Sequence, residues 1–467
     1  MKLTGNYTED IRRLGEVLGV GRNFDCISRH MKVGEDEVTF FYIDGFVKDA
    51  ELQRIMGQVT GAKSAGSMRE MLALVAYVEV GVATDDDKIV TAVLSGQTAL
   101  LSESFGGEAI LIDARTYPAR QTAEPDSDRV MQGARDGFVE TLVMNTALLR
   151  RRIRDPRLSM EHFSVGTVSK TDVVVCYMRG VASGELVTDI KNKLKEIKPK
   201  SLSLGYQSLA ECLIRRGWLN PFPKIRTTER PDTAAAQVME GSVIIFCDTS
   251  PQAMILPTSI FDYLQQTDDY YFPPLTGTYL RLVRTAILIL SMFVTPLWYV
   301  VLENAEILPP YLAFLVPDEP GALPIILQLL LVEIAIDGLK IASMNTPDML
   351  SNSLSVIGAL ILGDFAVGVG WVCEDVILYM AFVALANFAQ QNAELGYAIK
   401  FVRVLTLIFV FGFGAWGLLL GLALFIFLIC TNRSVSGKYH YLYPLVPFDG
   451  RALKRLVVRV KKDDFDR

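Results

Sequence analysis

From about residue 281 to residue 430 the sequence is a series of apolar segments, and this series restricts the chain to folds that cross a membrane. A helix that spans a bilayer needs about 20 mostly apolar residues. The segments that approach this length cover residues 285–302, 323–343, 354–372, 376–390 and 401–430. The fourth is short for one crossing, and the last is longer than one crossing needs. We therefore expect an all-α polytopic membrane domain over residues 281–432.

Basic residues on both flanks of the apolar series predict its orientation. Arg281 and Arg284 precede the first segment, and the bases that follow the last are Arg433, Lys438, Arg451, Lys454 and Arg455. Because Lys and Arg accumulate on the cytoplasmic side, both soluble ends are expected there, which requires an even number of crossings. Either one segment is re-entrant, or the glycine-rich final run bends into two passes. We favour four full crossings with one interrupted element.

Ionisable residues inside the apolar segments are the main functional signal. An unpaired charge in hydrocarbon costs roughly 3 kcal/mol or more. Glu333, Asp337 and Lys340 fall at i, i+4 and i+7, so they share one stripe of the second segment. A structural pair of Asp337 with Lys340 explains this stripe as well as an ion path lined by Glu333 does. Both explanations therefore stay open.

The third segment places a carboxylate beside large apolar side chains. Ile357, Leu360, Ile361 and Asp364 share one helical face. A cation pore with a hydrophobic gate combines these two features. Close helix packing is the alternative, and it accounts for the glycines of this segment but not for Asp364. We expect these four residues, together with Glu333, to line a pore.

The first 280 residues alternate charged and apolar stretches like a soluble α/β protein. We divide them into two α/β subdomains, residues 1–120 and 121–280. Strands are expected at residues 38–46, 108–114, 172–178 and 242–247, and helices at 49–59, 67–75, 138–154 and 184–197. Such alternation predicts a sheet covered by helices. Since the N-terminus has no apolar core of a signal peptide, we expect this α/β region to be cytosolic.

Arg150, Arg151 and Arg154 project from one side of the helix expected at residues 138–154. The acids nearby in the sequence are Asp126, Asp128, Asp136 and Glu140. A solvated charged face with ion pairs to these acids is the favoured explanation. Contact with an anion or a partner protein is the alternative.

The stretch that starts at Asp449 sorts into an apolar and a basic face. The apolar face carries Leu453, Leu456, Val457 and Val460, and the basic face carries Arg451, Lys454, Arg455, Arg459 and Lys462. A helix of this kind lies on an anionic membrane surface. We expect residues 433–467 to form a short cytosolic tail with an amphipathic helix, whose basic residues contact the lipid membrane.

Composition and motifs argue against several functions. The formal charge of −6 lacks the clustered basic excess that nucleic-acid binding needs. The six cysteines are scattered and the three histidines have neither metal spacing nor an adjacent nucleophile. Residues 57–64 resemble a phosphate loop, but Ala62 separates Gly61 from Lys63 and no buried strand precedes them. We expect no enzyme activity, no metal and no cofactor.

Nearly the whole chain carries a collinear series of motifs. They are Arg135-Asp-Gly-Phe-Val-Glu140, Asn145-Thr-Ala-Leu-Leu-Arg-Arg-Arg-Ile-Arg-Asp155, Lys170-Thr-Asp172, Asn220-Pro-Phe-Pro223, Thr228-Glu-Arg-Pro-Asp232 and Pro444-Leu-Val-Pro-Phe448. Together they resemble the GerA family, the A subunits of bacterial spore germinant receptors. Phe24-Asp25, Tyr42-Ile-Asp-Gly-Phe46 and Asp113-Ala-Arg-Thr-Tyr-Pro118 are closer to a sporulation-protein branch of this family than to receptor subunits.

The resemblance implies a protein of endospore-forming bacteria in the spore inner membrane, with its soluble domain facing the core. It also implies participation in germination with other spore germination membrane proteins, and ring-shaped homo-oligomers with a central ion path. The stretch at residues 355–363 resembles the family's pore-lining helix. Receptor subunits often have Gln where this chain has Asp364, and a ring of carboxylates attracts cations more strongly than a ring of amides.

Three functions are compared on this basis. The first is an oligomeric subunit that conducts monovalent cations and triggers or amplifies germinant signalling. The second is a non-conducting scaffold that assembles germination receptor and partner proteins. A secondary transporter ranks last, because the sequence shows no repeats at corresponding positions of its membrane part.

Overall fold

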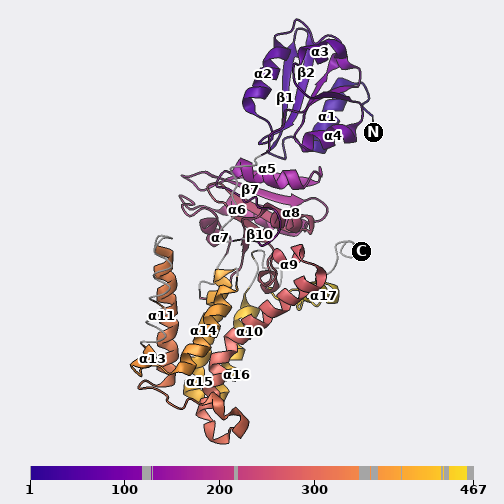
Figure 1. Cartoon of the computed structure of the whole chain (residues 1–467). Helices are drawn as coiled ribbons and strands as arrows, with labels where there is room; N and C mark the ends of the chain where they lie inside the picture. The colour runs from indigo at the N-terminus through magenta and orange to yellow at the C-terminus, as the bar shows by residue number, and fades with distance from the viewer. Residues whose placement is uncertain are drawn as a thin grey trace. The chain divides into compact units, whose positions relative to one another are not determined.

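The structure, a computed structural model, describes residues 2–117, 128, 130–214, 219–345, 358, 366–390, 392–432, 435 and 441–459. The chain divides into two compact units (Figure 1). The first comprises Met1–Arg216, Ile225–Thr258 and Ser434–Lys438, and the second comprises Gly217–Lys224, Ser259–Arg433 and Tyr439–Arg467. The first unit contains the strands, and the second contains the long helices.

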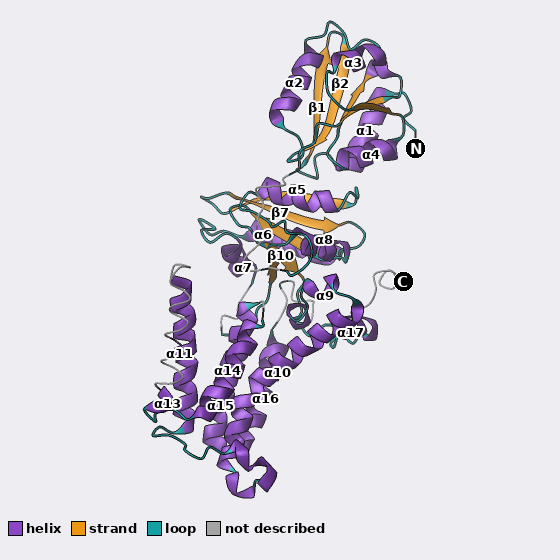
Figure 2. Ribbon diagram, in the orientation of Figure 1, coloured by secondary structure: helices purple, strands orange, loops and turns teal. Residues whose placement is uncertain are grey.

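The first subdomain is an antiparallel sheet in the order β1-β2-β4-β5-β3. Its strands are β1 (Cys26–Val33), β2 (Asp36–Ile43), β3 (Val80–Ala83), β4 (Thr98–Ser102) and β5 (Ala109–Ile112). Its helices are α1 (Tyr7–Leu18), α2 (Asp49–Thr60), α3 (Met68–Leu74), α4 (Asp86–Leu94) and the 3-10 turn η1 (Glu103–Phe105). Side chains alternate along β2, so Phe41 packs with α1 and α4 while Phe40 packs with α2 and α3. Helices therefore cover both faces of the sheet (Figure 2).

The second subdomain repeats this topology. Its strands are β6 (Leu158–Val165), β7 (Thr171–Met178), β8 (Arg226–Thr228), β9 (Val243–Cys247) and β10 (Ala253–Leu256), in the order β6-β7-β9-β10-β8. Its helices are α5 (Leu142–Arg152), α6 (Gly184–Glu196), α7 (Tyr206–Leu213) and α8 (Pro231–Met239). Both subdomains follow the order α-β-β-α-α-β-α-β-β along the chain, and corresponding strands have corresponding neighbours. The third to sixth residues of β2 and of β7 are all buried.

The strands and helices expected in residues 1–280 are all present, with their ends shifted by a few residues. The helix expected at residues 138–154 spans Leu142–Arg152, for example. Strands β3, β4, β8 and β10 were not expected, and neither were β1 and β6. Strands β1 and β6 each lie at the edge of their sheet and carry exposed polar residues, such as Arg29 in β1 and His162 in β6. Glu161 in β6 is partly exposed. An edge strand of this kind lacks the apolar run that marks a buried strand.

The second unit is helical. It contains η2 (Ile260–Tyr263), α9 (Asp268–Tyr271), α10 (Pro274–Glu303), η3 (Ala305–Ile307), η4 (Pro310–Leu315), α11 (Ile325–Asn345), α13 (Ala366–Gly368), α14 (Glu374–Phe388), α15 (Ala393–Phe413), α16 (Ala415–Thr431) and α17 (Gly450–Val457). Among the residues that the structure describes, α10 and α15 are the two helices long and apolar enough to cross a membrane. Helix α16 is apolar but shorter.

Two apolar clusters fix the directions of these helices. Leu288 of α10, Leu395 of α15 and Ile429 of α16 belong to one cluster. Trp298 of α10 and Leu407 of α15 belong to the other, together with residues from the first turns of α11 and α14. Helices α10 and α15 therefore run in the same direction, while α16 returns. The start of α10 and the end of α16 lie at the same end of the helical unit.

Gly414 divides the final apolar run into two helices. Its φ of 58° and ψ of −142° suit glycine and disfavour residues with a side chain. Helix α16 then folds back along α15, with Gly417 against the backbone of Phe409 and Gly421 against Thr406. The glycine-rich final run therefore bends into two helices. That both helices cross the membrane stays a prediction. The number of four crossings stays a prediction.

Gly417→Ala is expected to lower the free energy of unfolding of the helical unit by about 1–3 kcal/mol, the usual range for overpacking. A Cβ at this position would clash with the backbone of Phe409, so the two helices must separate. Thermal unfolding of the purified protein in detergent, followed by circular dichroism, measures the change. Gly412→Ala is the control, because nothing lies within 4 Å of a Cβ there. Equal stability of the two variants would contradict the close approach.

Candidate functional site

A buried ion pair joins α11 and α15 in the interior of the helical unit. Glu333 on α11 is 6% exposed and Arg403 on α15 is 1% exposed. Arg403 Nη2 donates to both carboxylate oxygens of Glu333, at 2.7 and 2.9 Å. Arg403 Nη1 donates to the carbonyl oxygen of Ser291 on α10, at 3.2 Å. A single arginine therefore connects three helices.

Lys400, one turn before Arg403, extends this network. Its Nζ lies 3.2 Å from Glu333 Oε1 and forms a second ion pair with Asp337. Two acids of α11 thus face two bases of α15. Because the four charges cancel, the network satisfies the requirement that ionisable groups in an apolar interior be paired.

One of the two explanations of the charged stripe is a structural pair of Asp337 with Lys340, and this pairing is wrong. Asp337 pairs with Lys400. Lys340 Nζ instead lies 4.8 Å from the centre of the Tyr397 ring. The two side chains of α11 are three residues apart, but the base contributed by α15 provides the ion pair.

Lys400 and Arg403 are the site residues to which the sequence pattern assigned no role. With Lys340 they are the only bases between residues 285 and 430. The scarcity of bases could have predicted their ion pairs, because a base in an apolar segment needs an acid nearby. Glu333 and Asp337 were the acids in reach, although 63 residues or more of sequence separate them from these bases.

The other residues expected to line a pore are Ile357, Leu360, Ile361 and Asp364, and they lie outside the described residues. Gly358 is described and buried, and a Cβ there would lie 2.7 Å from Leu339 Cδ2. Helix α11 therefore approaches this glycine closely, as small residues allow between membrane helices. The pore-lining role of all five residues stays a prediction. The Glu333 carboxylate forms an ion pair with Arg403 of the same chain.

Arg150 is fully buried, so the expected solvated arginine face is wrong for this residue. Its Nε and Nη2 donate to the two carboxylate oxygens of Asp25, at 2.8 and 2.9 Å. Asp25 is itself 2% exposed. The backbone N–H of Phe24 donates to the carbonyl of Met160 in β6 at 3.1 Å. The ion pair therefore lies where the two subdomains join.

Burial and charge shift the titration of groups around this pair. Burial alone would lower the pKa of Arg150, but the adjacent Asp25 carboxylate outweighs that effect and raises it. Burial raises the pKa of the Cys26 thiol to about 12, and the charge of Asp25 adds to the shift. Arg150 therefore stays charged and Cys26 stays a thiol at neutral pH, which suits a structural joint and not a reactive site.

Arg151 and Arg154 have different surroundings from Arg150. The guanidinium carbon of Arg151 lies 4.5 Å from the centre of the Tyr117 ring. Arg154 is exposed and follows the end of α5. The three arginines therefore do not form one anion site. Contact of the exposed Arg151 and Arg154 with a partner stays a prediction.

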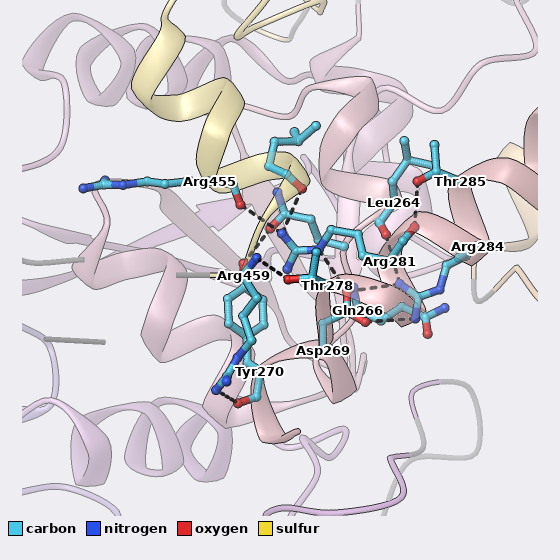
Figure 3. Close-up of polar contacts among 12 residues, drawn as sticks. Leu264, Gln266, Asp269, Tyr270, Thr278, Arg281, Arg284, Thr285, Arg455 and Arg459 are labelled. Carbon is cyan, nitrogen blue, oxygen red and sulfur yellow. Dashed lines mark hydrogen bonds and ion pairs between the residues drawn. The ribbon is translucent and has the colours of Figure 1, made fainter. Parts of the chain in front are cut away.

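A second polar cluster joins the start of α10 to the C-terminal segment, as Figure 3 shows. Asp269 on α9 is fully buried and accepts from Arg281 Nε at 3.3 Å and from Arg284 Nη2 at 3.0 Å. Arg281 Nη1 donates to the carbonyl oxygens of Arg455 and Leu456, both at 2.9 Å. These carbonyls lie in the last turn of α17, where a helix leaves acceptors unsatisfied. One aspartate and two arginines therefore hold α9, α10 and α17 together.

Helix α17 is the amphipathic helix expected in the basic tail. The Asp449 side chain caps its first turn by accepting from the Arg451 N–H at 2.9 Å. Arg451 and Lys454 are exposed. Arg459 follows the helix, and its Nη2 donates to the carbonyl of Tyr270 at 2.5 Å. Contact of the tail with a membrane surface stays a prediction.

The similarity to known proteins covers nearly the whole chain. The model of the family described as Bacillus/Clostridium GerA spore germination protein matches residues 13–467. Stage V sporulation protein AF of Bacillus subtilis (strain 168) is 35% identical over 450 residues, which cover 95% of this chain and 90% of that protein. The motifs near residues 24–46 and 113–118 predicted closeness to that protein within the family, and this similarity is confirmed.

Two further proteins are similar. The uncharacterized membrane protein YfkQ of Bacillus subtilis (strain 168) is 28% identical over 93% of this chain and 85% of its own length. The crystal structure of the N-terminal domain of the A subunit of the Bacillus megaterium spore germinant receptor GerK3 has 25% sequence identity and a TM-score of 0.41. That similarity covers 55% of this chain and 96% of the solved chain.

Proposed function

Since this chain belongs to the GerA family of spore germination proteins, we propose that it is an oligomeric, cation-conducting subunit that triggers or amplifies germinant signalling. It is a membrane protein involved in spore germination or sporulation. The proposed location is the spore inner membrane, and the proposed partners are further copies of this chain, other spore germination membrane proteins and monovalent cations. No catalytic role is proposed.

The observation that carries the proposal is how the charges of the apolar region are paired. Glu333 and Asp337 are neutralised by Arg403 and Lys400, so helix packing already explains these two acids. Asp364, the acid of the third apolar segment, lies outside the described residues. A carboxylate in that position calls for a function of its own.

In the proposed assembly, copies of the third apolar segment surround a central path. Their Asp364 carboxylates attract monovalent cations, and the apolar side chains of Ile357, Leu360 and Ile361 form a constriction that closes by excluding water. The ion-pair network of α11 and α15 holds the surrounding helices in place. In this arrangement Glu333 supports the path through its pair with Arg403.

Asp364→Asn is expected to reduce the monovalent cation flux several-fold, because a ring of amides attracts cations less than a ring of carboxylates. The measurement is ion flux through the purified protein, with its partner proteins, reconstituted in vesicles. Asp318→Asn is the matched control, because it removes one exposed carboxylate from the loop before α11. Unchanged flux in Asp364→Asn, at equal insertion into the vesicles, would exclude this residue from the path.

A non-conducting scaffold remains the second candidate, and the ion pairs of Glu333 and Asp337 favour it. They are what a scaffold needs in order to hold its helices together without an aqueous path. Vesicles that contain the complete assembly but show no conductance would select this function. The conductance of these vesicles thus distinguishes the two candidate functions.

The orientation with both soluble ends in the cytosol has support from the arrangement of the helices. The start of α10 and the end of α16 lie at the same end of the helical unit. Arg281 and Arg284 lie at that end with the C-terminal helix α17. Because basic residues accumulate on the cytoplasmic side, this end is proposed to face the spore core.

A further inference from the structure

A pocket of about 130 Å³ lies between the second half of α11, the end of α14 and the start of α15. Its polar lining residues are Asp337, Lys340, Asn387, Gln390, Tyr397 and Lys400. Because α15 begins beside it, the pocket lies at the end of the helical unit where α10 also begins and α16 ends. A headgroup of the adjacent membrane leaflet can reach a site at such a position.

The charges around the pocket leave one positive charge unbalanced. Lys400 is paired with Asp337, and Arg403 is paired with Glu333. Lys340 has no acidic partner among the residues that the structure describes. Among the described residues of this ion-pair network and the pocket lining, three bases and two acids give a net charge of +1. The surplus charge belongs to a residue that lines the pocket.

Gln390 gives an independent indication of a ligand. It is 8% exposed and lines the pocket, and its Nε2 has no hydrogen-bond acceptor in the described parts of the chain. Buried donors without an acceptor are rare in native proteins, and a ligand that supplies the acceptor is one explanation for them. The Asn387 amide and the Lys340 ammonium line the same pocket. These groups together offer donors and positive charge to the oxygens of an anion.

We propose that the pocket binds the phosphate group of an anionic phospholipid. A phosphate diester carries one negative charge and acceptor oxygens, which match the surplus charge of Lys340 and the free amide N–H of Gln390. Basic pockets between membrane helices bind anionic headgroups in this way.

The apolar surface of α14 favours a lipid over a soluble phosphate compound. Leu385 is 69% exposed and Phe388, which lines the pocket, is 68% exposed. Acyl chains of a lipid whose phosphate occupies the pocket can cover these side chains. The proposal needs only a membrane around the helices, so it holds for a conducting and for a non-conducting protein.

The test is a titration of the full-length protein in detergent, with the midpoint of thermal unfolding as the readout. The probes are short-chain phosphatidylglycerol, short-chain phosphatidylcholine and inorganic phosphate. Phosphatidylglycerol is expected to raise the midpoint at concentrations where the other two have no effect. Lys340→Gln is expected to weaken its apparent affinity at least tenfold, while Lys340→Arg keeps it.

Further variants control for folding and for general charge effects. Lys32→Gln removes an exposed lysine of β1 and should bind phosphatidylglycerol like the parent protein. Gln390→Glu adds a carboxylate to the pocket and should weaken binding even if Lys340→Gln does not fold. Equal effects of the two lipids, or equal affinities of Lys32→Gln and Lys340→Gln, would overturn the site. An equal effect of inorganic phosphate would overturn the lipid assignment in favour of a soluble phosphate compound.

Discussion

Asp25→Asn is expected to lower the free energy of unfolding of the N-terminal region by about 3–5 kcal/mol, the range for breaking a buried ion pair from one side. The change leaves the guanidinium of Arg150, which has no exposed surface, without its counter-charge. Native-state hydrogen exchange of the full-length protein measures the effect on the buried amides of β7. Because each 1.4 kcal/mol is a factor of about ten, their exchange should be accelerated more than a hundredfold.

Asp155→Asn is the matched control for this prediction. Asp155 also pairs with an arginine, but the Arg157 side chain is 59% exposed. An exposed pair contributes at most about 1 kcal/mol, so β7 exchange should change little. The double variant Asp25→Asn with Arg150→Met removes both charges and should lose less than the sum of the two single variants. Similar exchange in Asp25→Asn and Asp155→Asn would show that the joint between the subdomains does not depend on this pair.

Glu333→Gln is expected to destabilise the helical unit by a similar amount, about 3–5 kcal/mol. It leaves Arg403, which is 1% exposed, without the negative charge of the Glu333 carboxylate. Arg403→Met should cost less, because Lys400 still lies 3.2 Å from the Glu333 carboxylate. Tryptophan fluorescence, to which the buried Trp298 of α10 contributes, follows the unfolding in detergent.

The control for Glu333→Gln is Glu306→Gln, which removes an exposed carboxylate from η3. Surface changes of this kind are usually within about 0.5 kcal/mol. The comparison also tests the expected pore-lining role of Glu333. If Glu333→Gln folds like the control and loses only ion flux, the carboxylate acts in the path and not in helix packing.

The buried ion pairs show what a sequence pattern leaves undetermined. Helical spacing placed Asp337 near Lys340 and grouped Arg150 with its neighbouring arginines, because only contacts within one helix can be derived from spacing. The actual partners, Lys400 and Asp25, come from other elements. Their pairing depends on how those elements pack, which spacing within one element does not contain.

The apolar segments and most buried strands were predictable, because their length and composition reflect burial directly. The position at which the final apolar run divides, Gly414, was harder to predict from the sequence. That run contains several glycines, and only the backbone conformation identifies the one with a positive φ at which the chain reverses. The correspondence between the two subdomains was also hidden, because shared strand order and helix order do not require similar residues.

The cluster around Asp269 has a mechanical consequence for the membrane part. Arg281 fixes α10 to α9 through Asp269 and to α17 through two backbone carbonyls. A rotation of α10 about its axis would therefore break these contacts or move α9 and α17 with it. A rotation imposed on the start of α10 would act on α9 and α17 together, because the same arginine contacts both. In this respect α9, the start of α10 and the C-terminal helix α17 form one structural unit.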